Sequence, residues 1–385
     1  MEESHTAESA VRIEFEQRSR RKPRRPMGCC CCHFAAMSRD DHILAEEALL
    51  DAGLAWWRTI RPDGPTISYA TTDVPLESVQ TKRLFIHTVE YSCGEPKPGA
   101  PALVCLHGFG FGIGLYYAAA PALAERWPGR VFCIDLLGCG LSSRPAWPLP
   151  YGHRCPLDAA EAYFTDAIEA WRIQLGLDAI ALLGHSISGY LAVAYAERHP
   201  DHLERLILAS PAGVPAPPPG LAEFHAQAPR VMRIVRMLFG RGWSPFFVAK
   251  DLGMGERALS GYITRRFGDG LAWIAKPELI KYLTGIWCRT PKSAGGYMHA
   301  ALLTFGGIPK GSQVKPPSAE TRPISACIMQ HTCVAALVLA ENLAFLPPPV
   351  HHRAGRVCLR SPPVGRPPPL TCRACASPLV HLRRV

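Results

Sequence analysis

The sequence predicts an α/β fold built on a mostly parallel, doubly wound sheet. Short apolar segments typical of buried strands alternate with segments of helical character, as expected for a parallel sheet covered on both faces. Three of the apolar segments end in glycine-containing turns. The chain has 385 residues, which suits one such domain with insertions or two small domains.

The predicted elements follow one another in the order that this fold requires. A first helix is expected over Ala45–Ile60, and an early strand over Lys82–Tyr91, where apolar and polar residues alternate. The parallel part of the sheet then begins. Its predicted strands are 102–106, 131–135, 178–183 and 203–209, and its predicted helices are 115–127, 158–175 and 189–199.

One stretch, Gly184-His185-Ser186-Ile187-Ser188-Gly189, joins a predicted strand to a predicted helix. A serine at such a turn presents its hydroxyl above the end of the sheet, beside the N–H groups of the helix N-terminus. This is the nucleophile elbow of an α/β-hydrolase, usually Gly-x-Ser-x-Gly. Ser186 is therefore the predicted catalytic nucleophile, and Gly184, His185, Ser188 and Gly189 are the predicted elbow residues. Ser188 stands where the second glycine is usual. A serine in an ordinary βα turn is the alternative.

Two further glycine-containing turns favour the hydrolase interpretation. A hydrolase holds the oxyanion with the N–H of the residue after the nucleophile and an N–H from the loop after an earlier strand. That loop is His107-Gly108-Phe109-Gly110, so the predicted oxyanion donors are Phe109 and Ile187. The next strand ends in Asp135-Leu136-Leu137-Gly138-Cys139-Gly140. Three such turns in this order predict an α/β-hydrolase fold.

The sequence predicts four parts. Residues 1–40 are expected to form a disordered N-terminal extension, and 41–214 the hydrolase core. Residues 215–306 open with a Pro-rich break and continue as short amphipathic segments, which predict a helical cap over Ser186. Met, Phe and Trp side chains of this cap are candidates to line an acyl-chain site, and plain packing between helices is the alternative. Residues 307–385 form an atypical Pro/Arg-rich tail without strand–helix alternation, for which disorder is expected.

The charge of the chain is unevenly distributed. The formal net charge is +10, yet residues 311–385 alone carry nine Lys and Arg against two Asp and Glu. Residues 41–310 are close to neutral, so the basic pI does not indicate nucleic-acid binding. No apolar run approaches the ~20 residues of a membrane span, and an apolar signal-peptide core is lacking. The 15 cysteines, in a fold of this kind and size, indicate a reducing, cytoplasmic compartment, and no metal or cofactor is expected.

The N-terminal region allows a second interpretation. Translation from Met27 would open the chain with Met-Gly-Cys-Cys-Cys-Cys, a pattern typical of combined myristoyl and palmitoyl anchoring. Cys32 stands at the position where the motif requires Ser or Thr, which argues against this lipid anchor. A solvated basic tail over Arg18–Arg25 is the simpler expectation.

Several segments resemble the α/β-hydrolase-domain subfamily of lysophospholipid lipases. They are Asp135–Pro145, Gly184–Tyr190, Pro200–Gly213 and the cap segments Trp243–Gly268 and Pro291–Gly306. The subfamily includes N-acylphosphatidylethanolamine lipases, lysophosphatidic-acid acyltransferases and a lipid-droplet coactivator of triglyceride lipase. The resemblance implies phospholipid or lysophospholipid substrates, a peripheral location on membranes or lipid droplets, and serine-dependent ester hydrolysis or acyl transfer. The alternative is a catalytically incomplete lipid-surface adaptor, like the coactivator, which lacks the serine.

The C-terminal part departs from the subfamily. Its members continue with a strand that carries the catalytic Asp and then a Gly-x-His loop, and neither is identified here. Glu341 followed by His351 or His352 has the expected order, but the nine residues between Glu341 and His351 cannot hold the ~11-residue helix and ~5-residue strand that normally intervene. The catalytic acid and histidine are therefore unknown, with His351 and His352 as weak candidates. Such a tail is also what GC-rich DNA encodes when read through an intron or out of frame.

Overall fold

The computed structural model describes residues 37–77, 84–150, 155–212 and 275–288. It also describes short helical pieces at 234, 237, 259–261 and 263–264, and the backbone of 325–329 and 380–381. All of these residues belong to the unit that covers 34–385. The predicted disordered extension lies almost wholly outside them and stays a prediction.

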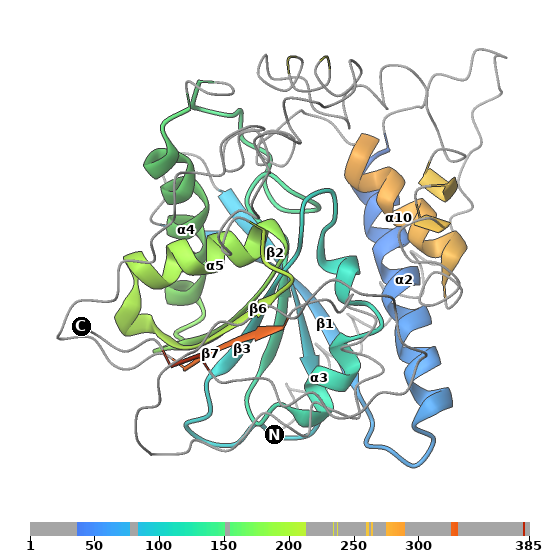
Figure 1. The fold of residues 1–385 in the computed structure, drawn as a ribbon. Helices are drawn as coiled ribbons and strands as arrows, with labels where there is room; N and C mark the ends of the chain where they lie inside the picture. The colour runs from blue at the N-terminus through green and yellow to red at the C-terminus, as the bar shows by residue number, and fades with distance from the viewer. Residues whose placement is uncertain are drawn as a thin grey trace, which may run out of the picture. The chain divides into compact units, whose positions relative to one another are not determined.

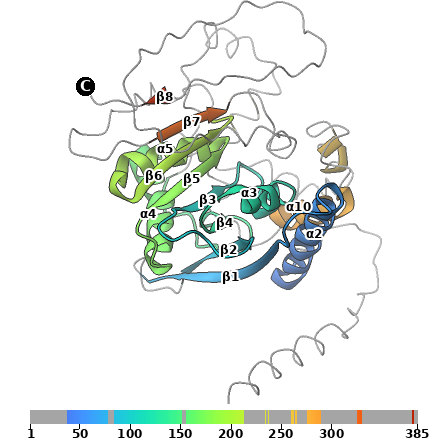
Figure 2. The same cartoon turned by 90° about the horizontal axis from the view of Figure 1, so that it is seen from below.

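The described strands form one sheet in the order β1-β2-β4-β3-β5-β6-β7-β8 (Figures 1 and 2). Strands β4, β3, β5, β6 and β7 are mutually parallel, whereas the pairings β1–β2, β2–β4 and β7–β8 are antiparallel. The predicted mostly parallel sheet is confirmed. The strands are β1 Ser68–Leu76, β2 Leu84–Ser92, β3 Ala102–Leu106, β4 Val131–Ile134, β5 Ile180–His185, β6 Leu203–Ala209, β7 Ser325–Met329 and β8 Val380–His381.

Helices cover both faces of this sheet (Figure 2). Alternate residues of the central strands point to opposite faces, and because these residues are apolar both faces are buried. On one face, Val104 and Leu182 pack with α4 and α5. On the other, Cys105 and Leu183 pack with α2, α3 and α10. None of the described helices combines the length and apolar character needed to cross a bilayer. The helices are α2 Arg39–Ile60, α3 Ala120–Arg126, α4 Leu157–Gln174, α5 Ile187–Arg198 and α10 Lys276–Cys288, with 3₁₀ turns η1 Ile113–Tyr116 and η3 Pro200–His202.

The N-terminal part of the structure differs from the expectation in two ways. Helix α2 begins six residues earlier than predicted, because the Ser38 side chain accepts a hydrogen bond from the N–H of Asp41 and caps the helix. Strand β1 was not predicted. It is an edge strand whose residues are mostly exposed, so it carries little of the apolar alternation that marks a half-buried strand.

The helix predicted over 115–127 is divided in the structure. The 3₁₀ turn η1 ends at Tyr116, and α3 starts only at Ala120 with Pro121 in its first turn. Proline favours a helix start because its fixed φ suits the first turn and its missing N–H is not needed there. The apolar residues of both pieces still pack in one cluster beneath α2 and α10, which is why a single helix was predicted.

Two segments of the predicted Pro/Arg-rich tail form strands, which the sequence analysis did not expect. Strand β7 pairs in parallel with β6, and the two-residue β8 pairs with β7. The five residues of β7 are too few for periodicity to distinguish a strand from a turn, but pairing with β6 gives their backbone a hydrogen-bonding partner. The remainder of 307–385 lies outside the described residues, so its predicted disorder stays a prediction.

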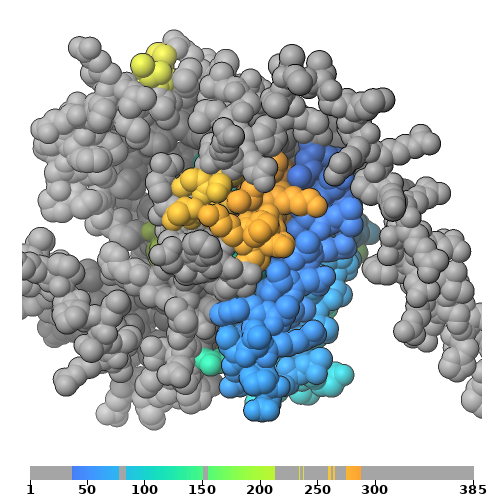
Figure 3. Space-filling model, turned by 90° about the vertical axis from the view of Figure 1, so that its right-hand side faces the viewer, coloured from blue at the N-terminus to red at the C-terminus, as the bar shows by residue number. Residues whose placement is uncertain are grey.

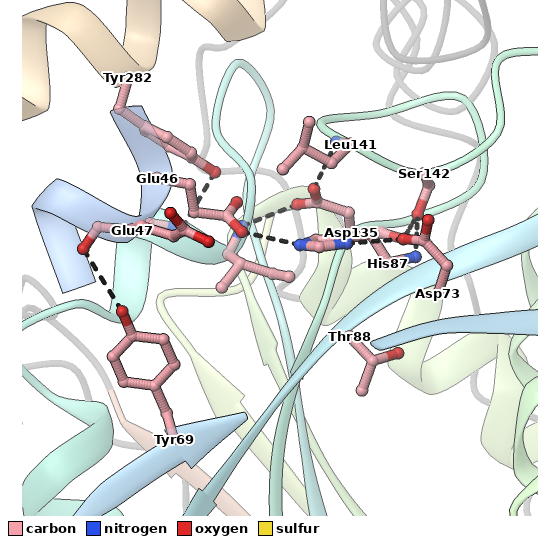
Figure 4. Close-up of polar contacts among 12 residues, drawn as sticks. Glu46, Glu47, Tyr69, Asp73, His87, Thr88, Asp135, Leu141, Ser142 and Tyr282 are labelled. Atoms are coloured by element: carbon pink, nitrogen blue, oxygen red, sulfur yellow. Dashed lines mark hydrogen bonds and ion pairs between the residues drawn. The ribbon is translucent and has the colours of Figure 1, made fainter. Parts of the chain in front are cut away.

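Helix α2 is tied to the edge of the sheet by a chain of alternating charges (Figure 4). Arg39 pairs with Asp73 of β1 at 2.6 Å, and the other oxygen of Asp73 lies 2.8 Å from Nδ1 of His87 in β2. Nε2 of His87 lies 2.7 Å from Oε1 of Glu46, back on α2. Burial alone would lower the pKa of His87, but the hydrogen bonds to Asp73 and Glu46 outweigh it and raise that pKa to about 10. Two cations thus alternate with two carboxylates.

This chain of charges predicts a pH-dependent stability. Because the pKa of His87 is about 10 in the folded protein and ~6.5 when unfolded, its stabilising effect is complete below pH ~6.5 and is lost as the pH rises through 10. We expect the free energy of unfolding to fall in this window with a slope approaching ~1.4 kcal/mol per pH unit. The double variant Glu46→Gln/His87→Gln removes one charge of each sign and should flatten the slope. Denaturant unfolding at pH 6, 8 and 10 measures the change of the unfolding free energy with pH. An equal change in the unmodified chain and the double variant would contradict this account.

The burial of the central strands predicts the reactivity of their thiols. Cys105 and Cys133 face each other across β3 and β4 and are 0% exposed. Cys93 and Cys155 are partly exposed. Maleimide labelling of the native protein should therefore modify Cys93 and Cys155 and spare Cys105 and Cys133, as read by peptide mass spectrometry. Rapid native modification of either strand cysteine would show that the sheet is assigned wrongly.

Candidate active site

Ser186 lies between the last residue of β5 and the first residue of α5, at the tight turn that the sequence predicts. Its φ is 56° and its ψ is −120°, a backbone conformation that costs a non-glycine residue ~1–3 kcal/mol. The turn is held by the neighbouring strand: the N–H of Ser186 donates to Ala209 O at 3.0 Å, and Ser186 O accepts from the N–H of Ala212 at 2.9 Å. Ser186 is partly exposed.

The two glycines of the elbow are required by close packing. A Cβ at Gly184 would lie 2.2 Å from the carbonyl oxygen of Ser188, and one at Gly189 would lie 2.6 Å from Cβ of Pro211. Both approaches are shorter than any real Cβ contact. Glycine at both positions therefore lets strand β5 and helix α5 approach closely.

Ser188, which replaces the second glycine of the usual pattern, is accommodated without backbone strain. It is 0% exposed and helical, and it is not among the described residues with positive φ. Its hydroxyl donates a hydrogen bond to the carbonyl oxygen of His107, in the loop after β3. The serine therefore links the elbow helix to the predicted oxyanion loop, a contact that a glycine cannot make.

The predicted oxyanion loop lies directly against the elbow. A Cβ at Gly108 would fall 3.3 Å from Cβ of Ser186 and 2.7 Å from Nδ1 of His185, so only glycine fits there. The next residues form a tight turn, in which the N–H of Phe111 donates to Gly108 O at 3.3 Å and Gly110 takes a φ of 78°. A residue with this φ at the third position is typical of a type II turn. Phe109 and Ile187, the predicted oxyanion donors, thus come from two adjacent segments.

His107 lies close to the elbow and 4.0 Å from Asp135, but its ring is used for structure. Nδ1 lies 2.9 Å from Gly108 O, and Nε2 accepts a hydrogen bond from the N–H of Leu136 at 3.2 Å. These partners require the neutral tautomer with the proton on Nδ1. Burial, the main cause, lowers the pKa of His107. A ring with both nitrogens bound to backbone cannot take a proton from Ser186.

Asp135 joins the two glycine-containing loops (Figure 4). One carboxylate oxygen accepts from the N–H of Ile113 at 2.8 Å, and the other accepts from the N–H of Leu141 at 2.7 Å. The side chain is completely buried, and a Cβ at Gly140 would lie 1.9 Å from its Oδ2. In the sequence, Asp135 is distinguished only as part of a family-specific stretch. Its role in holding both loops required the fold.

The structure leaves the catalytic acid and base unassigned. Glu341, His351 and His352 lie outside the described residues, so these candidates stay predictions. The Oγ of Ser186 forms no hydrogen bond to any residue in the described ranges. In open α/β sheets functional groups gather beyond the carboxyl ends of the strands. For β7 that end leads into residue 330 and beyond, which the structure does not describe.

One group of described residues, on α4, at the end of α5 and on η3, has the composition of a metal site. Ligand atoms of Glu169, His199 and His202 lie within 4.8 Å of one another. However, the guanidinium of Arg172 donates to both oxygens of Glu169, at 2.6 and 2.9 Å, and lies 3.1 Å from Nδ1 of His202. A fixed positive charge inside the group opposes a metal cation, so these residues form an ion-pair network. The expectation of no metal is not tested further.

Comparison with known proteins places this geometry in context. Residues 101–238 match the family model described as alpha/beta hydrolase fold. A 1-acylglycerol-3-phosphate O-acyltransferase of Arabidopsis thaliana is 34% identical over 194 residues, which are 50% of this chain and 44% of that protein. A (lyso)-N-acylphosphatidylethanolamine lipase of Homo sapiens is 40% identical over 151 residues, 39% of this chain and 41% of that protein. The 1-acylglycerol-3-phosphate O-acyltransferase ABHD5 of Sus scrofa is 44% identical over 118 residues, 30% of this chain and 31% of that protein.

The chain spans less than half the length of these curated relatives. Over that span, the matched sequence includes the strands and turns that carry Phe109, Asp135 and Ser186. Sheet order, elbow geometry and sequence therefore agree on an α/β-hydrolase fold, and the matched span is similar to 1-acylglycerol-3-phosphate O-acyltransferases and (lyso)-N-acylphosphatidylethanolamine lipases.

Proposed function

We propose that this chain is a serine-dependent lipid ester hydrolase or lysophospholipid acyltransferase that acts peripherally at a membrane or lipid-droplet surface. The observation that carries the proposal is the backbone of Ser186, which has a positive φ beside the glycine turn of 108–111. Strain of this kind concentrates at functional sites. The similarity to a 1-acylglycerol-3-phosphate O-acyltransferase and a (lyso)-N-acylphosphatidylethanolamine lipase supports the substrate class.

In the proposed reaction, Oγ of Ser186 attacks the carbonyl carbon of an acyl ester while its proton passes to a base. The carbonyl oxygen becomes an oxyanion, which the N–H groups of Phe109 and Ile187 stabilise. The ester C–O bond then breaks, and the leaving alcohol takes the proton from the base, so that an acyl-serine remains. Attack by water releases a fatty acid, whereas attack by the hydroxyl of a lysophospholipid yields a phospholipid. The two outcomes differ only in the acceptor.

The second candidate function is a catalytically incomplete hydrolase fold that acts as a lipid-surface adaptor or lipase coactivator. The observation that favours it is that Oγ of Ser186 has no hydrogen-bond partner in the described part of the chain. A serine hydroxyl is a weak nucleophile until an oriented base accepts its proton. The two functions make opposite predictions for a variant that lacks the hydroxyl.

The variant Ser186→Ala distinguishes the two functions. We expect the full chain to release fatty acid from lysophosphatidic acid, or to form phosphatidic acid when an acyl thioester is supplied as donor. The variant should lose at least ~10³-fold in kcat, because removing the nucleophile of a serine triad has effects of this size or larger. Chromatographic separation of labelled fatty acid from labelled phosphatidic acid distinguishes hydrolysis from acyl transfer in one assay.

Ser210→Ala is the matched control. Ser210 also has a positive φ, 46°, and follows the adjacent strand β6, but it is exposed and stands outside the elbow. We expect it to retain the activity of the unmodified chain. Equal rates for the chain and Ser186→Ala would contradict catalysis by this serine. Vesicle binding that survives in Ser186→Ala would then support the adaptor function.

A further inference from the structure

The predicted oxyanion turn is bound on one side by the core of the domain. The hydroxyl of Ser188 donates to His107 O before the turn, and the N–H of Ile113 donates to Asp135 after it. Between these two anchors the chain passes through Phe109 and Gly110. A donor to an oxyanion acts only when it lies ~2.7–3.1 Å from the developing charge, so the orientation of this turn determines whether Phe109 can serve.

Helix α10 binds the same turn from the other side. Nε1–H of Trp287 donates to the carbonyl oxygen of Gly110 at 2.9 Å, across 177 residues of sequence. Five residues earlier on the same helix, the hydroxyl of Tyr282 accepts from the N–H of Gly114 at 3.0 Å (Figure 4). A Cβ at Gly112 would lie 2.4 Å from that hydroxyl, so helix and loop are in direct contact.

Helix α10 is itself firmly placed. Tyr282 and Leu283 are 0% exposed, and the helix packs along α2 (Figure 3). Gly285 approaches His42 of α2 so closely that a Cβ would lie 2.5 Å from the imidazole. The indole of Trp287 is therefore presented to Gly110 by a buried helix rather than by a mobile side chain on a loop.

We propose that Trp287 is a positioning residue of the oxyanion hole. Its indole N–H holds the Gly110 carbonyl and so orients the turn in which Phe109 presents its own N–H to the substrate oxygen. The inference rests on the function proposed above, because an oxyanion hole has a role only if Ser186 attacks an ester. It also makes the geometry of the hole depend on the seating of α10, a helix within the predicted cap.

Trp287→Phe tests this inference, because it removes the donor and retains an aromatic ring. The matched control is Trp127→Phe, since Nε1–H of Trp127 donates to a backbone carbonyl in the same way, to Pro101 O at 2.8 Å, but at the amino end of β3, whereas the oxyanion loop follows its carboxyl end. With p-nitrophenyl butanoate as substrate, we expect kcat to fall about tenfold in Trp287→Phe while KM is unchanged. In Trp127→Phe both constants should stay within about twofold of the unmodified chain. The effect is smaller than the ~10²–10³-fold loss of kcat on removal of a whole oxyanion donor, because Trp287 only positions the donor.

The thiono analogue of the same ester provides a ratio of rate constants that does not depend on how much of the protein is folded. Its sulfur accepts hydrogen bonds poorly, so it gains little from the oxyanion hole. The ratio of kcat for the oxygen ester to kcat for the thiono ester should therefore fall about tenfold in Trp287→Phe and stay constant in Trp127→Phe. An unchanged ratio in Trp287→Phe would overturn the positioning role.

Hydrogen exchange of peptides that cover 107–114 separates this inference from the proposed function. We expect about tenfold faster exchange in Trp287→Phe than in the unmodified chain, and no change in Trp127→Phe. Unchanged exchange overturns the proposal whatever the enzymatic result. If hydrolysis does not depend on Ser186 at all, the proposed function fails first and the positioning role falls with it, even if exchange shows that the indole restrains the loop.

Discussion

The rest of the site depends on the backbone conformation of Ser186. A φ of 56° with a ψ of −120° is unfavourable for a residue with a side chain, and the turn persists because the surrounding structure fixes both of its ends. Strand β5 lies between β3 and β6 in the parallel sheet, and the segment after β6 binds the N–H and C=O of Ser186. Gly184 and Gly189 supply the close approach that a Cβ would prevent.

The buried polar side chains near the elbow mostly form hydrogen bonds to main-chain groups and take no part in the proposed reaction. His107, Asp135 and Ser188 are buried, and each bonds to main-chain groups of a neighbouring loop. Loops at the end of a sheet carry backbone donors and acceptors that no strand partner satisfies, and leaving one buried without a partner costs ~1–3 kcal/mol. These side chains provide the missing hydrogen-bond partners for the loop backbones, and the same hydrogen bonds fix the distances between the loops.

Segments outside the matched domain residues contribute to the same arrangement. Helix α2 precedes residues 101–238 and is bound to the sheet edge through Arg39, Asp73, His87 and Glu46. Helix α10 follows them, packs along α2 and reaches the oxyanion turn. The charges that join α2 to the sheet edge alternate in sign, and their mutual attraction offsets part of the desolvation cost of burying them. The loop beside Ser186 is therefore supported by residues more than 160 positions away in the sequence.

The parallel sheet, the order of its central elements and the location of Ser186 could be predicted from the sequence alone. Those features follow from local signals: continuous apolar strands, glycine turns and a serine at a strand-to-helix boundary. The edge strand β1 escaped detection because an exposed edge needs no apolar alternation, and β7 because five residues are too few to show a period.

Tertiary structure alone decided which polar groups act together. A histidine next to the elbow has the residue type of a catalytic base, but only its two backbone partners reveal that His107 is neutral and structural. The bond from Trp287 to Gly110 and the pairing of Glu46 with His87 join positions that no sequence spacing relates. Hydrogen bonds and ion pairs depend on distances of about 3 Å between groups far apart in the chain, and those distances exist only after the hydrophobic core has fixed the elements that carry them.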